Sequence, residues 1–293
     1  MSKKTALIMS GGGAKGAFQA AAEKYAREEK GYHWDIIAGV SVGALNGAML
    51  SMEKYARLWQ IWNSISDDQV YTGGFNLWSV IKLAFGAKSF YGNEPLWKML
   101  QAELDPSLVK ADLRVGSVSL VSGEYVQFTH TEPQLARAVL ASTVMPVIWT
   151  PVDISSLYRS MVDGGVRNIT PIGDVLDSDP DEVVIINCGP ETETVLANPP
   201  ANVVEIGMRT LDILLNEVFR QDMDNFQRIN GLVKEAGAQG VTLHDPNSGK
   251  PFKYFECKII EPVSPLDDTL DFSQPSIQRS IKAGWDRAKE IFG

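Results

Sequence analysis

The sequence predicts a three-layer α/β/α protein with a mostly parallel central sheet. An apolar run at residues 5–9 is followed by a glycine-rich loop and by a segment of helical composition, residues 14–29. The same order of apolar run, short glycine-containing loop and helix recurs at residues 34–38 and 42–52. Strands that alternate with helices across short loops are typical of a parallel sheet covered by helices. A third observation is the β-branched apolar run at residues 183–187, which we expect to be a central strand.

The middle of the chain continues this pattern. We expect a mainly helical stretch broken at TGGFN, then two strands around the turn Ser122-Gly123, then a helix with Pro133 near its first turn, and then a strand that runs into a tight turn. In chain order these elements are expected at residues 53–104, 113–120, 124–128, 132–142 and 156–165.

The last third of the chain is expected to complete the same domain. A polar, proline-rich loop leads into a long helix, a turn-rich segment, a strand and a final helix that begins near Ser273, with Pro275 in its first turn. The first four are expected at residues 190–202, 203–236, 244–252 and 254–260. No internal repeat or long linker divides the chain, so we expect one domain over residues 1–293, which residues 200–293 complete.

Composition and charge narrow the classes of protein that fit. Of the 293 residues, 44% are apolar and 22% are charged, which is typical of a folded chain and not of a disordered one. The formal net charge of −9 argues against a general nucleic-acid-binding protein, because such a protein needs a basic surface. No apolar run reaches the ~18 residues of a membrane span, and no signal-peptide core is recognisable. We expect a cytoplasmic protein with no transmembrane segment and at most peripheral membrane contact.

A serine with the features of a catalytic nucleophile follows the second expected strand. Residues 39–43 read Gly-Val-Ser-Val-Gly, which is the pattern G-x-S-x-G between a strand and a helix. A serine at such a sharp turn points outward, at the carboxyl end of the sheet and beside a helix N-terminus. The alternative is that Ser41 only caps the helix, since serine is a good N-cap residue. The strand–turn–helix context favours Ser41 as a nucleophile.

A serine nucleophile needs a base, and the sequence offers two kinds. Asp163 ends an apolar strand and precedes two glycines, so its carboxylate can face an open cleft, where partial dehydration would raise its pKa. The alternative is an aspartate that only bonds its own turn. The histidines are His33, His130 and His244, and His244 has the Ser…Asp…His order of an α/β-hydrolase triad. None of the three has a local catalytic context, so Asp163 is the better candidate.

The glycine-rich loop admits two interpretations. Gly11, Gly13 and Gly16 fit G-x-G-x-x-G, a dinucleotide-binding fingerprint, but the acid that should follow about 20 residues later is missing, since Asp35 stands at the start of its strand. No Lys-Ser/Thr pair follows as in a Walker A loop. The second interpretation is an oxyanion hole, in which the backbone N–H groups of Gly11, Gly12 and Gly13 stabilise a negative charge that develops during acyl transfer.

Three motifs in this order resemble the patatin-like phospholipases. They are SGGGAKG at residues 10–16, GVSVGALNG at 39–47 and DGGVRNITPI at 163–172, and ASTVMPVIWTPVDI, just before the aspartate, is also similar to the family's sequence. The resemblance covers about residues 4–190. One departure is RNITPI, where the family more often has the asparagine and the proline closer together.

The resemblance implies a patatin-like three-layer fold and a Ser–Asp dyad that works without a histidine. By this match Ser41 is the nucleophile, Asp163 is the general base, and Gly11, Gly12 and Gly13 supply the oxyanion N–H groups. Lys15 matches a basic position of the family, where it is either a solvated lysine at the helix start or a catalytic group. Asn46 also matches, but we assign it no catalytic role because such an asparagine can simply bond the backbone.

An apolar, aromatic stretch at residues 75–92 is a further feature of interest. One face of a helix would carry Leu77, Trp78, Ile81, Ala84 and Phe85. Such a helix either packs in the core or forms a lid or acyl-chain wall that touches lipid, where Lys82 and Lys88 could assist.

These observations together predict a carboxylic ester hydrolase that degrades lipids. Ser41 and Asp163 would cleave the ester bonds of a phospholipid or acylglycerol through an acyl-enzyme, with the substrate presented at a membrane or micelle surface. No metal ion or organic cofactor is implied, and the two cysteines match no metal spacing. The alternatives are a thioesterase or acyltransferase on the same dyad, a nucleotide-binding protein that uses the glycine loop, and a non-catalytic binding protein.

Overall fold

The central sheet of the protein is mostly parallel, as predicted. A computed structural model describes residues 3–70, 72–73, 91–146, 148–189, 195, 199–201 and 203–293. The spatial order of the main strands is β6 (Tyr125–Thr129), β5 (Asp112–Ser119), β2 (Ile36–Gly39), β1 (Thr5–Met9), β8 (Glu182–Ile186) and β9 (Glu256–Ile260). The pairs from β5 to β9 are parallel, whereas β6 and the short strand β7 (Met161–Asp163) run antiparallel to β5.

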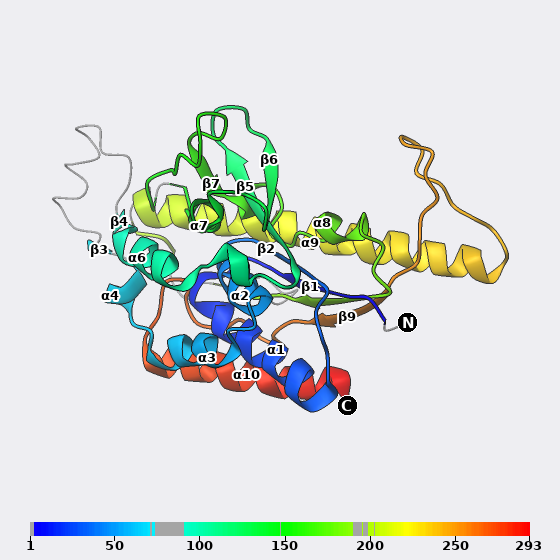
Figure 1. The fold of residues 1–293 in the computed structure, drawn as a ribbon, viewed down its shortest axis with the longest axis horizontal. Helices are drawn as coiled ribbons and strands as arrows, with labels where there is room; N and C mark the ends of the chain where they lie inside the picture. The colour runs from blue at the N-terminus through cyan, green and yellow to red at the C-terminus, as the bar shows by residue number, and fades with distance from the viewer. Residues whose placement is uncertain are drawn as a thin grey trace.

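Two layers of helices cover the two faces of this sheet, and the alternation of side chains along each strand decides which layer a residue contacts. In β1, Leu7 and Met9 belong to the core shared with α1 (Gly16–Lys30), α2 (Val42–Ser51), α3 (Tyr55–Ser64) and α10 (Gln274–Phe292). Ala6 and Ile8 belong to the core on the opposite face, with α8 (Gly173–Leu176) and α9 (Val203–Ala238). Figure 1 shows α9 on one side of the sheet and α1, α3 and α10 on the other, which is the predicted α/β/α arrangement.

The remaining elements lie between or beside these layers. They include three short helices, which are α4 (Asp67–Val70), α6 (Glu94–Glu103) and α7 (Leu135–Ser142). Two 2-residue strands, β3 (Thr72–Gly73) and β4 (Tyr91–Gly92), pair with each other. The 3-10 turns cover Gly13–Lys15, Pro106–Leu108 and Gly164–Val166. The described part of residues 53–104 is therefore mainly helical, as predicted. The apolar helix predicted at residues 75–92 lies outside the described residues, apart from β4 at its end.

The predicted strand at residues 156–165 is much shorter in the structure and corresponds only to β7. A turn occupies the residues before it, because the N–H groups of Ile154 and Ser155 both donate to the carbonyl of Tyr158. Ser160 then adopts a φ of 50°, which no strand residue can have. Smaller differences concern the helix predicted from residue 132, which begins at Leu135, and the strand predicted from residue 254, which begins at Glu256.

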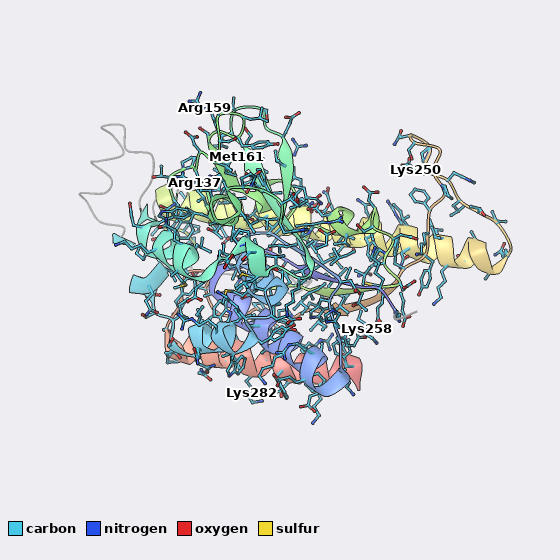
Figure 2. All side chains as sticks on the ribbon, viewed as in Figure 1. Arg137, Arg159, Met161, Lys250, Lys258 and Lys282 are labelled. Atoms are coloured by element: carbon cyan, nitrogen blue, oxygen red, sulfur yellow. The ribbon has the colours of Figure 1, made fainter. Side chains whose placement is uncertain are left out.

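The long helix α9 is the largest element that no sequence motif marks. Its 36 residues span roughly 54 Å at 1.5 Å per residue. Phe219 and Met223 are buried against the sheet, and the side chain of Asn230 bonds both the N–H and the carbonyl of Phe255. Beyond the helix, the predicted turn-rich segment forms an arm that stands away from the sheet (Figure 1), with Lys250 near its tip (Figure 2).

Candidate active site

Ser41 occupies a strained turn between β2 and α2. Its backbone has φ 57° and ψ −127°, a conformation that is uncommon for a residue with a side chain. The N–H of Ser41 donates a 2.9 Å hydrogen bond to the hydroxyl of Ser142, at the end of α7. The serine is largely buried, with 9% of its surface exposed. No sequence pattern points to Ser142, because the contact joins residues 101 positions apart.

The glycines on either side of the elbow are required by close contacts. A Cβ on Gly43 would lie 2.2 Å from the carbonyl oxygen of Met9, and one on Gly39 would lie 2.2 Å from the carbonyl of Gly43. These distances are far below a normal contact, so α2 can start this close to β1 and β2 only without side chains at both positions. The G-x-S-x-G pattern therefore describes a steric requirement of this turn.

The glycine-rich loop joins β1 to α1 on the same edge of the sheet. Gly13 adopts φ 55°, and a Cβ there would lie 2.2 Å from the carbonyl oxygen of Thr269. The N–H of Gly11 donates to the carbonyl of Ile169 at 3.1 Å. Those of Gly12 and Gly13, in contrast, have no hydrogen-bond partner among the described residues. Of the three predicted oxyanion donors, the loop thus leaves two N–H groups available for a ligand.

Strand register brings Asp163 to the same level as Ser41. Gly39, the last residue of β2, pairs with Val115 of β5, and Asp163, the last residue of β7, pairs with Ser117. Ser41 lies two residues beyond Gly39, just as Ser117 lies two residues beyond Val115. Because β7 runs antiparallel to β5, its carboxyl end meets the carboxyl end of β2 head-on. Two residues more than 120 positions apart in the chain thereby become neighbours.

The carboxylate of Asp163 is buried and lies beside the serine. It accepts a 2.8 Å hydrogen bond from the N–H of Gly165. Burial raises the pKa of Asp163 from its usual 3.8 to about 6, although the Ser41 hydroxyl and the Gly165 N–H both favour the ionised form and oppose this rise. The group therefore combines proximity to the hydroxyl and a pKa close to neutral pH.

A buried network of side-chain hydrogen bonds holds the backbone at both ends of the glycine-rich loop. Asn46 donates to the carbonyl of Gly16 at 3.0 Å and to the Gln19 side chain at 3.1 Å, and it accepts a 2.9 Å hydrogen bond from the indole of Trp62. Gln19 in turn donates to the carbonyl of Ser10 at 2.8 Å. Asn46 therefore bonds the backbone, as the sequence analysis anticipated. The role of Gln19 was missed, and its only signal was a polar residue within an alanine-rich, apolar helix.

A cavity of about 380 Å³ opens over the serine and the aspartate. Apolar side chains of α2, α3 and α6 line it, including Met49, Leu58 and Leu100. Charged side chains also line it, and they include Lys15, Arg209 and Asp212 of α9, and Asp268 between β9 and α10. The cavity lining thus combines apolar and charged side chains with Ser41 and the glycine loop.

The other candidates from the sequence lie elsewhere. All three histidines are described and none lines the cavity. His33 and His244 are exposed, with His244 on the arm beyond α9, and His130 lies with Nδ1 3.7 Å from a carboxylate oxygen of Asp112. Asp35 accepts a hydrogen bond from the N–H of Thr5 at the amino end of the sheet, far from the position that a ribose partner requires.

The described residues hold neither a metal-binding cluster nor a membrane-spanning helix. They contain no group of three or more histidine, cysteine, aspartate or glutamate side chains arranged to hold a metal ion. None of the helices in this part of the chain is long and apolar enough to cross a membrane. Cys188 is buried and Cys257 is half-buried, and both are free thiols.

The fold and the elbow define the chain as an α/β protein with a strained serine at the carboxyl edge of a mostly parallel sheet. The sequence model of the patatin-like phospholipases matches residues 7–176, which is more than half of the chain. The protein therefore belongs to the patatin-like phospholipase family, a family of lipid acyl hydrolases, as its motifs predicted.

Among solved structures, the crystal structure of VipD from Legionella pneumophila is similar to the protein, with 14% sequence identity and a TM-score of 0.49. The match covers 99% of this chain and 67% of that one. No curated protein sequence matches the chain.

Proposed function

We propose that the protein is a serine acyl hydrolase that cleaves lipid esters with Ser41 as nucleophile and Asp163 as general base. The observation that carries this proposal is that Ser41 and the Asp163 carboxylate lie together at the wall of the cavity, beside two N–H groups of the glycine loop. A nucleophile, a base beside it and unpaired backbone donors are the parts that acyl transfer needs.

In the first half of the reaction, Asp163 accepts the hydroxyl proton as the Ser41 oxygen attacks the ester carbonyl carbon. The carbonyl oxygen becomes negatively charged, and we assign its stabilisation to the N–H groups of Gly12 and Gly13. Gly11, whose N–H already donates to Ile169, would then shape the loop. When the tetrahedral intermediate collapses, the carbon–oxygen bond to the alcohol breaks, and the alcohol leaves with the proton from Asp163.

In the second half, the acyl group is released to water. Asp163, ionised again, takes a proton from a water molecule as that water attacks the acyl-enzyme carbonyl. The same two N–H groups stabilise the second oxyanion. Collapse of this intermediate breaks the bond to Ser41, whose oxygen regains the proton from Asp163, and a fatty acid leaves.

The environment of Asp163 supports its role as a base. An ordinary aspartate, with a pKa near 3.8, is a weak base for a hydroxyl proton, whereas burial raises the pKa of this one to about 6. The carboxylate is then still ionised at neutral pH but holds a proton more readily during the reaction.

The cavity supports a lipid ester as substrate, a phospholipid or an acylglycerol drawn from a membrane or micelle surface. Its apolar side chains suit an acyl chain, and its charged side chains suit a polar headgroup. We also propose that residues 1–293 act as one domain, since β9 extends the central sheet and α10 packs on α1.

A fluorophosphonate probe, which reacts covalently with activated serines, tests this proposal together with fatty-acid release from phospholipid micelles. We expect labelling and turnover in the wild type and in the exposed-serine control Ser64→Ala. Ser41→Ala should lose both activities, and Asp163→Asn should lose turnover. Labelling that survives in Ser41→Ala would refute the assignment of the nucleophile. Acyl transfer to an added alcohol or thiol in place of water would support the acyltransferase alternative.

A further inference from the structure

We propose that a group of charged side chains in the cavity wall binds a zwitterionic phospholipid headgroup, with the phosphate near Lys15 and Arg209 and the ammonium group near Asp212 and Asp268. This inference rests on the proposed function and specifies its substrate class. It concerns a surface that the family's motifs do not include, because three of the four residues lie beyond residue 200.

The four residues come from three separate parts of the fold. Lys15 directly follows the glycine loop, and Arg209 and Asp212 stand three residues apart, and so on neighbouring positions of α9. Asp268 belongs to the segment between β9 and α10, whose Thr269 carbonyl accepts the N–H of Ala14 in the glycine loop. All four line the cavity that also contains Ser41.

The charges of this group balance and influence one another. Two cationic and two anionic side chains give a formal sum of zero. The charge on Lys15 acts on the carboxyl of Asp212, as do those of Asp268 and Arg209, while partial burial raises the pKa of Asp212 above its usual value. The group is thus a set of interacting charges at the cavity wall.

The neighbouring Asp267 shows that not every acid in this segment faces a ligand. Its carboxylate accepts hydrogen bonds from Arg279 at 2.9 Å and from the Ser276 hydroxyl at 3.1 Å, so it is used within the fold. Asp268 uses one oxygen for the N–H of Leu270 at 2.8 Å, which holds its side chain in place. Because this hydrogen bond fixes one carboxylate oxygen of Asp268, it also fixes the position of the second oxygen.

The chemistry of this group selects among headgroups. A phosphocholine or phosphoethanolamine carries one negative and one positive group, and so matches both signs. An anionic headgroup without an amine would bring its charge against two carboxylates, and an acylglycerol has no charge to match. Since apolar side chains such as Met49 and Leu100 line the same cavity, a phospholipid can place its ester beside Ser41, with its acyl chain against apolar side chains and its headgroup at the charged group.

Short-chain phospholipids below their critical micelle concentration test this site without interference from surface charge. We expect the wild type to hydrolyse a short-chain phosphatidylcholine with higher kcat/KM than the matching phosphatidylglycerol. Asp212→Asn should lower this ratio about fivefold, since it removes one partner of a partly exposed ion pair. The matched control Asp224→Asn changes the same functional group on the same helix outside the cavity lining, and should leave the ratio unchanged.

A second pair of variants tests the phosphate contact. Arg209→Gln should lower kcat/KM for both phospholipids but not for a p-nitrophenyl ester, which has no headgroup. Arg228→Gln, on the exposed part of α9, should leave kcat/KM unchanged for all three substrates. If Asp212→Asn does not fold, Asp268→Asn tests the same ratio. An unchanged ratio in both acid variants would refute the headgroup site while ester hydrolysis persists. If the wild type hydrolyses none of these esters in a Ser41-dependent way, the proposed function itself is refuted.

Discussion

The two walls of the cavity are built in different ways. The wall that holds Ser41, the glycine loop and Asp163 is buried, with 9% of Ser41 and 7% of Asp163 exposed. Its groups are joined by hydrogen bonds to backbone and buried side chains. The wall formed by α9 and the segment before α10 presents charged side chains that are half-buried, such as Arg209, or exposed, such as Asp212 and Asp268.

The difference reflects the separate structural requirements of catalysis and of substrate binding. A reacting serine and its base must stay within a few tenths of an ångström of a productive geometry, which requires a rigid, packed environment. A headgroup site works through charges over longer distances and tolerates small movements. We therefore expect substitutions on the first wall to have large effects on rate or stability, and those on the second to alter substrate preference.

The largest effect on rate is expected from Asp163→Asn. The amide cannot accept the serine proton, so kcat should fall by about 10³–10⁴-fold, as for loss of one member of a comparable catalytic unit. Steady-state hydrolysis of a short-chain ester measures this change. A decrease of less than tenfold would mean that another group serves as the base.

Asp163→Asn, although it lowers the rate, should raise the free energy of unfolding near neutral pH. The pKa of Asp163 is higher in the folded protein than its usual 3.8, so the folded state favours the protonated acid, and this contribution is lost as pH rises through about 6. The ionised carboxylate then costs up to about 3 kcal/mol of stability at pH 8. Denaturant unfolding should show that Asp163→Asn gains stability relative to the wild type between pH 5 and pH 8. An equal difference at both pH values would contradict the raised pKa.

Gly43→Ala tests the steric requirement of the elbow. Its methyl group would lie 2.2 Å from the carbonyl oxygen of Met9, so α2 must shift, at a cost of about 3 kcal/mol in unfolding free energy. A displaced Ser41 should lose on the order of 100-fold in rate. Gly47→Ala, on the same helix, is the control, because its methyl would meet only the side chains of Ile37 and Leu113 and its effects should be much smaller.

Activity should also depend on pH through the same carboxylate. Because Asp163 must be ionised to act as a base and its pKa is about 6, kcat/KM should rise with pH up to this value and level off above it. Below pH 6 it should fall about tenfold per pH unit. A midpoint near 4 would indicate that the site is hydrated during catalysis.

Ser142→Ala should have a smaller effect, on the position of the nucleophile. Without this hydroxyl the buried N–H of Ser41 loses its acceptor, at a cost of about 1–3 kcal/mol in stability. We expect a decrease in kcat of about tenfold with little change in KM. Ser51→Ala, a buried serine that bonds the carbonyl of Ala48 within its own helix, controls for the loss of a buried hydroxyl and should leave kcat unchanged.

The smallest effect is expected from His244→Ala. This histidine lies on the arm beyond α9 and does not line the cavity, so kcat/KM should stay within about twofold of the wild type. A loss of activity in a folded His244→Ala variant would replace the Ser–Asp dyad with a triad.

Much of the fold and one wall of the site follow from the sequence. The loops after β1 and β2 belong to successive strand–helix units, and parallel neighbours place their carboxyl ends on one edge of a sheet. The glycine loop and Ser41 could therefore be predicted to meet from residues 5–52 alone. The predicted strand before Asp163 was too long because a local turn at residues 154–158 outweighs the β propensity of the segment.

The sequence by itself determined most of the order of the elements and the elbow at Ser41, and it predicted Asp163 as the candidate base, since these depend on local patterns and short motifs. Only the tertiary structure decided how the site is assembled. The register of β7 on β5 sets Asp163 opposite Ser41, the carbonyl of Ile169 occupies the N–H of Gly11, and α9 brings Asp212 to the cavity. Contacts of this kind join residues far apart in the chain, and their geometry depends on how whole elements pack, which no local pattern encodes.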